Sequence, residues 1–338
     1  MNIERLKEKI KITKDGTIII GDNISCDGSS IDKPVSIISH AHGDHIKHFE
    51  SALSYCNHVI TSAQTKDLLI AERGSWLKWR RNFIGLSYGE TFDVSQNEHI
   101  KLFPVKHVLG ASQVLVETTY GRAVYTGDFN YPNTDPIKTD VLIMEATYGC
   151  SEDVRQQSEQ QLLDQFVSLI TREIGQRKPV YVFAHPGKIQ CLMSILTNAG
   201  VEIPFICGPK DFKWIEVYRK YGYTIGTVLQ QGSSEAAEIQ KSGSPFISFH
   251  RIGSNVPEAK DFLKIRVSAF MAKEDFYELQ PNYYVIALSD HADFNGLLEY
   301  VRRSEAQLVI TDGSRCPKAY MLAREIKERL GIEALALP

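Results

Sequence analysis

The sequence lacks the features of a membrane-spanning, secreted or polycationic protein. No stretch reaches the ~18 consecutive apolar residues that a transmembrane helix needs. The N-terminus, MNIERLKEKIKITKDG, is charged throughout and has no apolar core of a secretory signal. The formal net charge of −3 excludes a chain that coats nucleic acid by its overall charge, so any such contact must be local. We therefore expect a cytoplasmic protein that does not bind membranes.

Cysteine is also sparse, and its spacing excludes two further classes. The chain has 6 cysteines among 338 residues and no CxxC pair. This spacing argues against a zinc ribbon and against a disulfide framework. We expect the cysteines to be reduced and mostly packing residues. The sequence also has no internal repeat and no low-complexity tract.

The first part of the chain is rich in short β-branched runs bounded by Gly, Asp or Pro, which predict strands. These runs are GTIII (16–20), VSIIS (35–39), HVITS (58–62), IKLFPV (100–105), QVLVETTYG (113–121), RAVYTGD (122–128) and DVLIMEA (140–146). After residue 150 the pattern changes, because Leu162, Phe166 and Ile170 recur at helical spacing and strand and helix signals then alternate. The overall pattern predicts an α/β protein.

The segment SIISHAHGDHIKHF (36–49) concentrates metal-ligand side chains directly after a predicted strand. Its H-x-H-x-D-H pattern offers His40, His42, Asp44 and His45. Imidazole and carboxylate groups suit zinc or manganese, and two histidines one residue apart can share an ion while the Asp-His pair addresses a second. A histidine-rich surface loop is the alternative. Further imidazoles and carboxylates follow other predicted strands: His107, Asp128, His291 and Asp312.

These motifs resemble the metallo-β-lactamase fold superfamily and, within it, the β-CASP nucleases. Residues 36–45 resemble the second superfamily motif, and later motifs follow in family order: KHVLGASQVLVE (106–117), VYTGDFN (124–130), DVLIMEATYG (140–149) and ALSDHADF (287–294). Within this family the chain is most similar to ligase-associated DNA exonucleases, also described as mRNA 3′-end processing factor-like exonucleases. The motifs that carry this similarity are SDHADF (289–294), VSAFMA (267–272) and GKIQ (187–190).

The resemblance implies an αββα metallo-β-lactamase sandwich with an inserted α/β β-CASP cap domain. The sandwich is expected to span 1–150 and 276–338, and the cap 151–275. The implied activity is that of a metal-dependent phosphodiesterase nuclease, an exonuclease that hydrolyses single-stranded DNA through a two-metal-activated water in DNA repair or processing. The implied partners are nucleic acid, with DNA favoured over RNA and a single strand or an end favoured as substrate, and a DNA ligase or other repair proteins.

Three alternatives to this activity stay open. An RNA-processing exo- or endoribonuclease of the same family is the nearest. A thioesterase of the glyoxalase II kind shares the metal fold, but EATYG and SDHADF argue against it. A non-catalytic scaffold would have lost metal ligands, whereas the H-x-H-x-D-H pattern is intact.

The resemblance also implies a role for each motif residue. Two divalent ions, Zn²⁺ or Mn²⁺, are expected: one bound by His40, His42 and His107, the other by Asp44 and His45, with Asp128 bridging them. Asp44 is also expected to act in catalysis by orienting the attacking hydroxide. Glu145 and His291 are expected beside the phosphate, with His291 as general acid. Asp27, in SCDG, is expected to support a ligand rather than bind metal itself.

Asp312 departs from the family pattern. VITDGSR (309–315) falls where RNA-processing relatives have a histidine ligand and Artemis-like DNA nucleases have an apolar residue. An aspartate there would either bind the second metal through oxygen, favouring manganese or magnesium, or cap a helix predicted at 317–329. Both readings stay open.

Two further segments predict contacts with nucleic acid. SWLKWRRNF (75–83) alternates tryptophans with lysine and arginine. Tryptophan rings can stack on nucleobases, and the cationic side chains can neutralise phosphates. The residues concerned are Trp76, Lys78, Trp79, Arg80 and Arg81. The alternative is an amphipathic helix whose tryptophans pack on the sheet. Lys188, in HPGKIQ, opens a predicted helix after a strand, so a phosphate could bind there. Its alternative is a plain helix start.

Overall fold

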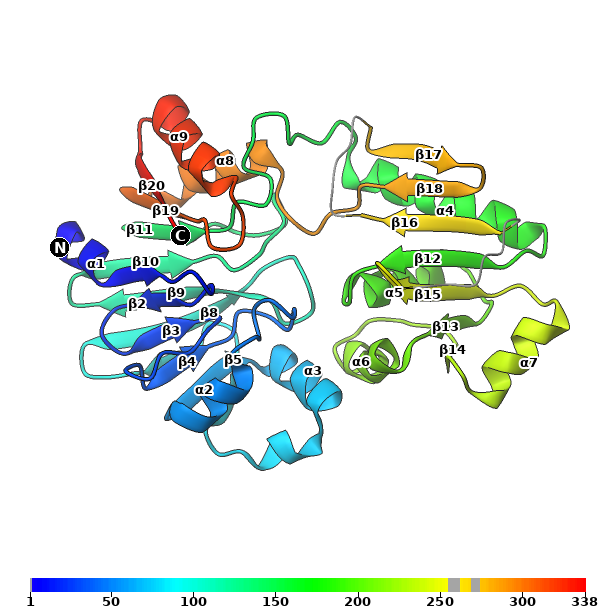
Figure 1. The fold of residues 1–338 in the computed structure, drawn as a ribbon, viewed down its shortest axis with the longest axis horizontal. Coiled ribbons are helices and arrows are strands. Elements are labelled where there is room, and N and C mark those ends of the chain that lie inside the picture. Colours follow the sequence, from blue (N-terminus) through cyan, green and yellow to red (C-terminus); the bar gives the residue numbers. More distant parts are fainter. Residues whose placement is uncertain (1, 255–261, 269–273) are drawn as a thin grey trace. The chain divides into compact units, whose positions relative to one another are not determined.

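The computed structural model describes residues 2–254, 262–268 and 274–338. Residues 269–272, in the VSAFMA segment, lie outside the described part. The chain divides into two units: unit 1 joins Met1–Val154 to Asp290–Pro338, and unit 2 is Arg155–Ser289. Both units combine sheets with helices (Figure 1), so the expectation of a mixed α/β chain is confirmed.

The first sheet of unit 1 contains strands that follow one another along the chain. Its order is β1 (Ile10–Ile12), β2 (Ile18–Ile20), β3 (Ile24–Cys26), β4 (Val35–Ile37), β5 (His58–Ser62) and β6 (Phe83–Leu86). The pairs from β3 to β6 are parallel, and those before them are antiparallel. Parallel neighbours end at the same edge, so the residues after β4 emerge beside the end of β5.

The second sheet of unit 1 brings the C-terminal part of the chain beside the N-terminal part. Its order is β20 (Glu333–Leu337), β19 (Leu308–Asp312), β11 (Val141–Met144), β10 (Gly121–Tyr125), β9 (Ser112–Thr118), β8 (Glu98–Pro104) and β7 (Thr91–Asp93). Strands β10, β11, β19 and β20 are parallel, while β7 to β10 form an antiparallel meander.

The two sheets of unit 1 pack against each other through alternating side chains. Val114 and Val116 of β9 lie in the same buried cluster as Ile20 and Ile37 of the first sheet. Leu115, between them, points to the opposite face, because successive side chains of a strand alternate between faces. There it packs with helices α8 (Phe294–Ser304) and α9 (Ala319–Leu330). Helices α2 (Phe49–Tyr55) and α3 (Ala63–Arg73) contact the first sheet.

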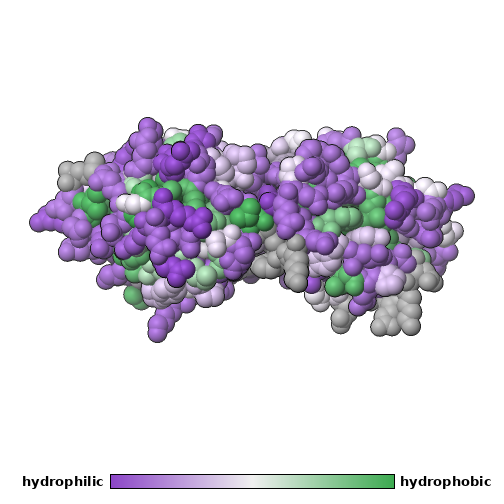
Figure 2. All heavy atoms as spheres, turned by 90° about the horizontal axis from the view of Figure 1, so that it is seen from above, coloured by the Kyte–Doolittle hydropathy of each residue, from purple (hydrophilic) through white to green (hydrophobic). Residues whose placement is uncertain are grey.

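The remaining helical elements of unit 1 are short: α1 (Ile3–Glu8) and the 3₁₀ helix η1 (Ser75–Trp79). Within the described residues, no helix is both long enough and apolar enough to cross a membrane. Figure 2 shows hydrophilic residues over most of the face in view, as expected when the apolar side chains are sorted into cores.

Unit 2 is built on one mostly parallel sheet. Its order is β14 (Val228–Gln230), β13 (Phe205–Cys207), β15 (Ile247–Arg251), β12 (Val180–Ala184), β16 (Leu263–Val267), β18 (Tyr283–Ile286) and β17 (Phe276–Gln280). Only the β17–β18 pair is antiparallel among these described strands. Its helices are α4 (Glu159–Gly175), α5 (Lys188–Asn198), α6 (Pro209–Lys220) and α7 (Ser234–Ser242). Because β18 pairs with β16, the unit runs to Ser289.

Candidate metal centre

The H-x-H-x-D-H segment leaves β4 at a point that both sheets of unit 1 hold in place. The backbone N–H of Ile38 donates to Ile60 of β5 at 2.8 Å, and Ser39 accepts a bond from the N–H of Ser112 of β9 at 3.0 Å. After these anchors the chain buries two of its histidines: the residue exposure is 0% for His40 and 1% for His45. Buried imidazoles need partners for their ring nitrogens.

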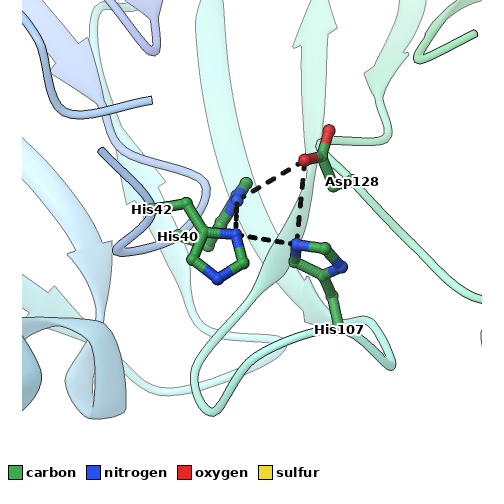
Figure 3. A group of neighbouring side chains, drawn as sticks. All are labelled: His40, His42, His107 and Asp128. Atoms are coloured by element: carbon green, nitrogen blue, oxygen red, sulfur yellow. Dashed lines mark hydrogen bonds and ion pairs between the residues drawn. The ribbon is translucent and has the colours of Figure 1, made fainter. Parts of the chain in front are cut away.

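His40, His42, His107 and Asp128 direct their ligand atoms toward one point (Figure 3). His42 Nδ1 lies 3.1 Å from His40 Nε2 and 3.0 Å from His107 Nε2. Asp128 Oδ2 lies 3.7 Å from His40 Nε2 and 3.7 Å from His107 Nε2. His107 comes from the β8–β9 loop and Asp128 follows β10, so the two sheets together assemble the group.

The hydrogen bonds fix which nitrogen of His107 faces this point with a lone pair. Its Nδ1 lies 3.0 Å from the carbonyl oxygen of Asp290, which can only accept, so Nδ1 carries the proton. Burial lowers the pKa of His107 to about 4, with the charge of His291 acting in the same direction. Burial also lowers the pKa of His40 well below its usual range. Neutral imidazoles with inward lone pairs are the form that binds metal.

A second convergence of donors lies around His45. Its Nε2 is buried and makes no well-aligned hydrogen bond. It lies 3.3 Å from a carboxylate oxygen of Asp44 and 3.3 Å from the same Asp128 oxygen that faces the first group. Burial disfavours the charged form of His45, but the carboxylates of Asp128 and Asp27 outweigh it and raise its pKa well above its usual range. The position favours positive charge.

Asp27 orients His45 from behind. It is buried, and its Oδ2 lies 2.7 Å from His45 Nδ1 and accepts bonds from the hydroxyls of Ser39 and Tyr125, each at 2.7 Å. Burial would raise the pKa of Asp27, but the charge of His45 and its hydrogen bonds lower it. Asp27 is therefore an ionised support, and it belongs to neither of the converging groups found among the described residues.

The chemistry of the donors fits divalent metal ions. Burial acts to raise the pKa values of Asp44 and Asp128, yet His45 holds both carboxyls below their ordinary range, so both are ionised. Neutral imidazole nitrogens and ionised carboxylates are ligands of zinc and manganese. Asp128 is the oxygen donor common to the two convergences, which suits a bridging position.

Glu145 and His291 form a pair beside this cluster. Glu145 follows β11 and accepts a bond from the backbone N–H of Phe129 at 2.8 Å, while its other oxygen lies 2.7 Å from His291 Nδ1. The carbonyl of Phe129 in turn accepts a bond from the N–H of Ala292, the residue after His291, at 2.6 Å. The backbone of Phe129 therefore positions both Glu145 and His291. Burial opposes charge on His291, but Glu145 prevails and raises its pKa to about 9. Ligand atoms of Asp128, Glu145 and His291 lie within 4.8 Å of one another.

Asp312 lies outside both groups of converging donors within the described residues. One of its oxygens pairs with Arg315 Nη1 at 2.5 Å, and the other accepts bonds from Ser314, including the backbone N–H at 2.9 Å. Of the two readings left open for Asp312, the helix cap is wrong, because α9 has Lys318 as its N-cap. Asp312 instead closes the turn that precedes the helix.

The residues predicted to contact nucleic acid differ in exposure and in hydrogen bonding. Lys78, Trp79 and Arg81 are exposed on η1 and just after it, whereas the guanidinium of Arg80 donates to the carbonyl of Leu53. Lys188 is the first residue of α5 in unit 2, and it is partly buried.

Several residues that shape the site belong to none of the predicted ligand or catalytic positions. Ser39 lies between Asp27 and His40, with its hydroxyl 2.9 Å from His40 Nδ1. Tyr125 bonds Asp27, and Arg315 pairs with Asp312. The sequence signal for Ser39 was its hydroxyl directly beside the predicted ligand His40, since hydrogen-bonding groups around a ligand orient it. Phe129 and Asp290 act through their backbone atoms, and no sequence signal indicates such a role.

Comparisons with known proteins place these observations in a family, although no family model matches the chain. An uncharacterized protein in the lig 3′ region of Acidianus ambivalens is 37% identical over 142 residues, which are 41% of this chain and 99% of that protein. An RNase J-like protein of Methanocaldococcus jannaschii is 30% identical over 213 residues, 55% of this chain and 50% of the relative.

A probable DNA ligase of Opitutus terrae is 27% identical over 321 residues, which are 89% of this chain but 28% of the ligase. The chain thus spans half or less of these last two relatives. A crystal structure of a protein of unknown function from Enterococcus faecalis V583 has a TM-score of 0.56 at 16% identity, over 92% of this chain and 81% of that one, and supports the fold alone. With the ordered motifs, these relatives show that the chain belongs to the β-CASP family of metallo-β-lactamase-fold nucleases.

Proposed function

We propose that this protein is a metal-dependent phosphodiesterase that removes nucleotides from the end of single-stranded DNA. In this proposal unit 1 is the αββα metallo-β-lactamase sandwich and unit 2 is the β-CASP cap inserted into it. The packing of two sheets with helices against each supports the first assignment. The inserted parallel α/β unit supports the second.

The observation that carries the proposal is the position of Asp128 between two sets of donors. On one side lie the nitrogens of His40, His42 and His107. On the other lie His45 Nε2 and the carboxylate of Asp44. These residues would hold two divalent ions, Zn²⁺ or Mn²⁺. Such ions supply Lewis acidity toward a phosphodiester and lower the pKa of a water molecule.

Asp44 and His291 would orient the attacking water and protonate the leaving group, respectively. Asp44 is more exposed than the other donors, with a side-chain exposure of 52%, and is positioned to orient the attacking water. His291 is held by Glu145 and its raised pKa keeps it protonated at neutral pH. It is therefore suited to protonate the departing sugar oxygen, which is the role of a general acid.

DNA is favoured over RNA as the substrate for two reasons. The SDHADF motif resembles that of the ligase-associated exonucleases. In addition, one relative that aligns with 89% of this chain is a probable DNA ligase. The similarity to an RNase J-like protein supports the alternative of an RNA-processing nuclease.

Matched single strands of DNA and RNA, labelled at the 5′ end, test the proposal. The purified protein is stripped of metal, reloaded with zinc, manganese or magnesium, and the products are resolved on a gel. We expect a metal-dependent ladder from DNA that disappears in His42→Ala. The matched control is His48→Ala, since His48 lies outside the cluster and pairs with Asp15. Equal cleavage by both variants, or faster cleavage of RNA, would contradict the proposal.

A further inference from the structure

Two tryptophans of η1 are exposed rather than packed. The exposed fraction of Trp79 is 84% and that of Trp76 is 48%, while Leu77 between them is buried. Leucine therefore anchors this element, and the alternative in which the tryptophans pack on the sheet is wrong. A large exposed aromatic side chain gives up burial that other tryptophans obtain, so it calls for an explanation.

The local backbone holds this element in place. Trp76 Nε1 donates to the carbonyl of Arg73 at 3.2 Å, and Gly74, with φ of 122°, makes the turn out of α3. A Cβ at Gly74 would lie 3.0 Å from the Trp76 ring. On the other side, Asn82 donates to the carbonyls of Leu53 and Cys56 at 3.0 and 3.1 Å. The exposed rings therefore sit on an element fixed at both ends.

The charge around these rings is positive. Residues 73–81 contain Arg73, Lys78, Arg80 and Arg81 and no acidic residue. Arg73 pairs with Glu50, and Arg80 is held by a backbone carbonyl. Across the described ranges, Lys78 and Arg81 are exposed and have no ion pair or hydrogen bond. Their charge is available to a negatively charged partner, and aromatic faces with nearby cations are the combination that binds single strands.

Helix α3 connects this element to the metal centre. At its N-terminal end, the hydroxyls of Ser62 and Thr65 donate to the carbonyl of Gly110 at 2.6 and 2.9 Å. Gly110 belongs to the loop that carries His107. At its other end α3 runs into η1, and its 11 residues cover about 16 Å at ~1.5 Å per residue. At ~3.4 Å per stacked nucleotide, that span is about five nucleotides.

We propose that Trp76, Lys78, Trp79 and Arg81 form a platform on which the bases of a single-stranded nucleic acid stack while its end occupies the metal centre. Charge complementarity and the rigid link through α3 favour nucleic acid over a protein partner. The inference rests on the proposed nuclease function and adds a substrate-length requirement to it.

Two substrates distinguish strand binding on the platform from catalysis at the metal centre. Binding of a fluorescein-labelled oligo-dT of about 16 nucleotides is measured by anisotropy with EDTA present, and hydrolysis of bis-p-nitrophenyl phosphate is measured with metal. Trp79→Ala should weaken strand binding about 5- to 150-fold and leave ester hydrolysis unchanged. Trp79→Phe should restore most of the binding. Tyr320→Ala, which removes an aromatic side chain that is 58% exposed on α9, is the control and should bind normally.

The charges give an independent readout. Removing both cations in Lys78→Ala/Arg81→Ala should reduce the slope of log K against log salt by about 1.4, since each phosphate contact on a single strand contributes about 0.7. If the unaltered protein binds and cleaves strands but Trp79→Ala binds within about twofold of it, the platform is refuted and a protein partner becomes the occupant to test. If the unaltered protein neither binds strands nor hydrolyses the ester, the proposed function itself fails.

Discussion

Asp27 orients His45, which we propose as a metal ligand. Its carboxylate holds His45 Nδ1 at 2.7 Å and so directs Nε2 toward Asp44 and Asp128. Asp27→Asn removes the charge that fixes this orientation, and we expect metal affinity to fall about 10- to 100-fold. Competition with a zinc-binding dye measures it. Asp15→Asn, at the surface pair with His48, is the control; equal affinities for the two variants would refute the role of Asp27.

His291 lies beside the donors without being needed to hold the first group. We therefore expect His291→Ala to keep its metal and substrate binding but to cleave at least about a hundredfold more slowly, as for a lost general acid. A substrate whose leaving group needs no protonation should recover much of the rate. His99→Ala changes a histidine of the surface pair with Asp93 and serves as control. No recovery with the activated substrate would mean that His291 binds the substrate instead.

Asp312 tests a position where the sequence left two readings open. Its carboxylate is buried and engaged by Arg315 and Ser314. Asp312→Ala leaves the guanidinium of Arg315 with its bond to the carbonyl of Gly16 but without a carboxylate partner. Loss of one member of a buried ion pair costs up to about 3–5 kcal/mol. We expect a lower melting temperature with unchanged metal content. A variant that melts normally but loses about half of its metal would show that Asp312 is a ligand.

Helix α4 illustrates an element that its own sequence specifies. Ser158 caps it, with Gln161 completing a capping box, and Leu162, Phe166 and Ile170 face inward at the predicted spacing. Ser158→Ala should destabilise unit 2 by about 1 kcal/mol because one N-terminal N–H loses its acceptor. Ser168→Ala, at an exposed position inside the same helix, is the control. Chemical denaturation compares them, and identical midpoints would contradict the capping role.

The strands differ in how well the sequence predicts them. The runs of β-branched residues before residue 147 each coincide with a strand, from β2 to β11. The strands β1, β3, β6 and β7 were not predicted. They are nearly as short as β2 and β4, but their sequences, IKI, ISC, FIGL and TFD, contain no continuous β-branched run. Their pairing depends on the neighbouring strands, which local sequence does not describe.

For the molecule as a whole, the sequence predicted the donor residues and the support of Asp27, but not the other groups that orient them. The family resemblance implied that His40, His107 and Asp128 would bind a shared ion, and the structure brings the three side chains together. The carbonyl of Asp290 and the backbone of Phe129 orient site residues without any side-chain signal. The Arg315–Asp312 pair was likewise missed, because long-range backbone and ion-pair contacts depend on the complete fold.

Metal content tests the central claim most directly. The protein is purified without chelator, saturated with zinc or manganese, freed of excess ion, and measured by elemental analysis against its concentration. Because Asp128 faces two sets of donors, we expect about two ions per chain. We expect about one ion in His45→Ala, which removes a donor from one set only. A reproducible content below one ion per chain in the unaltered protein, even after saturation, would contradict the account.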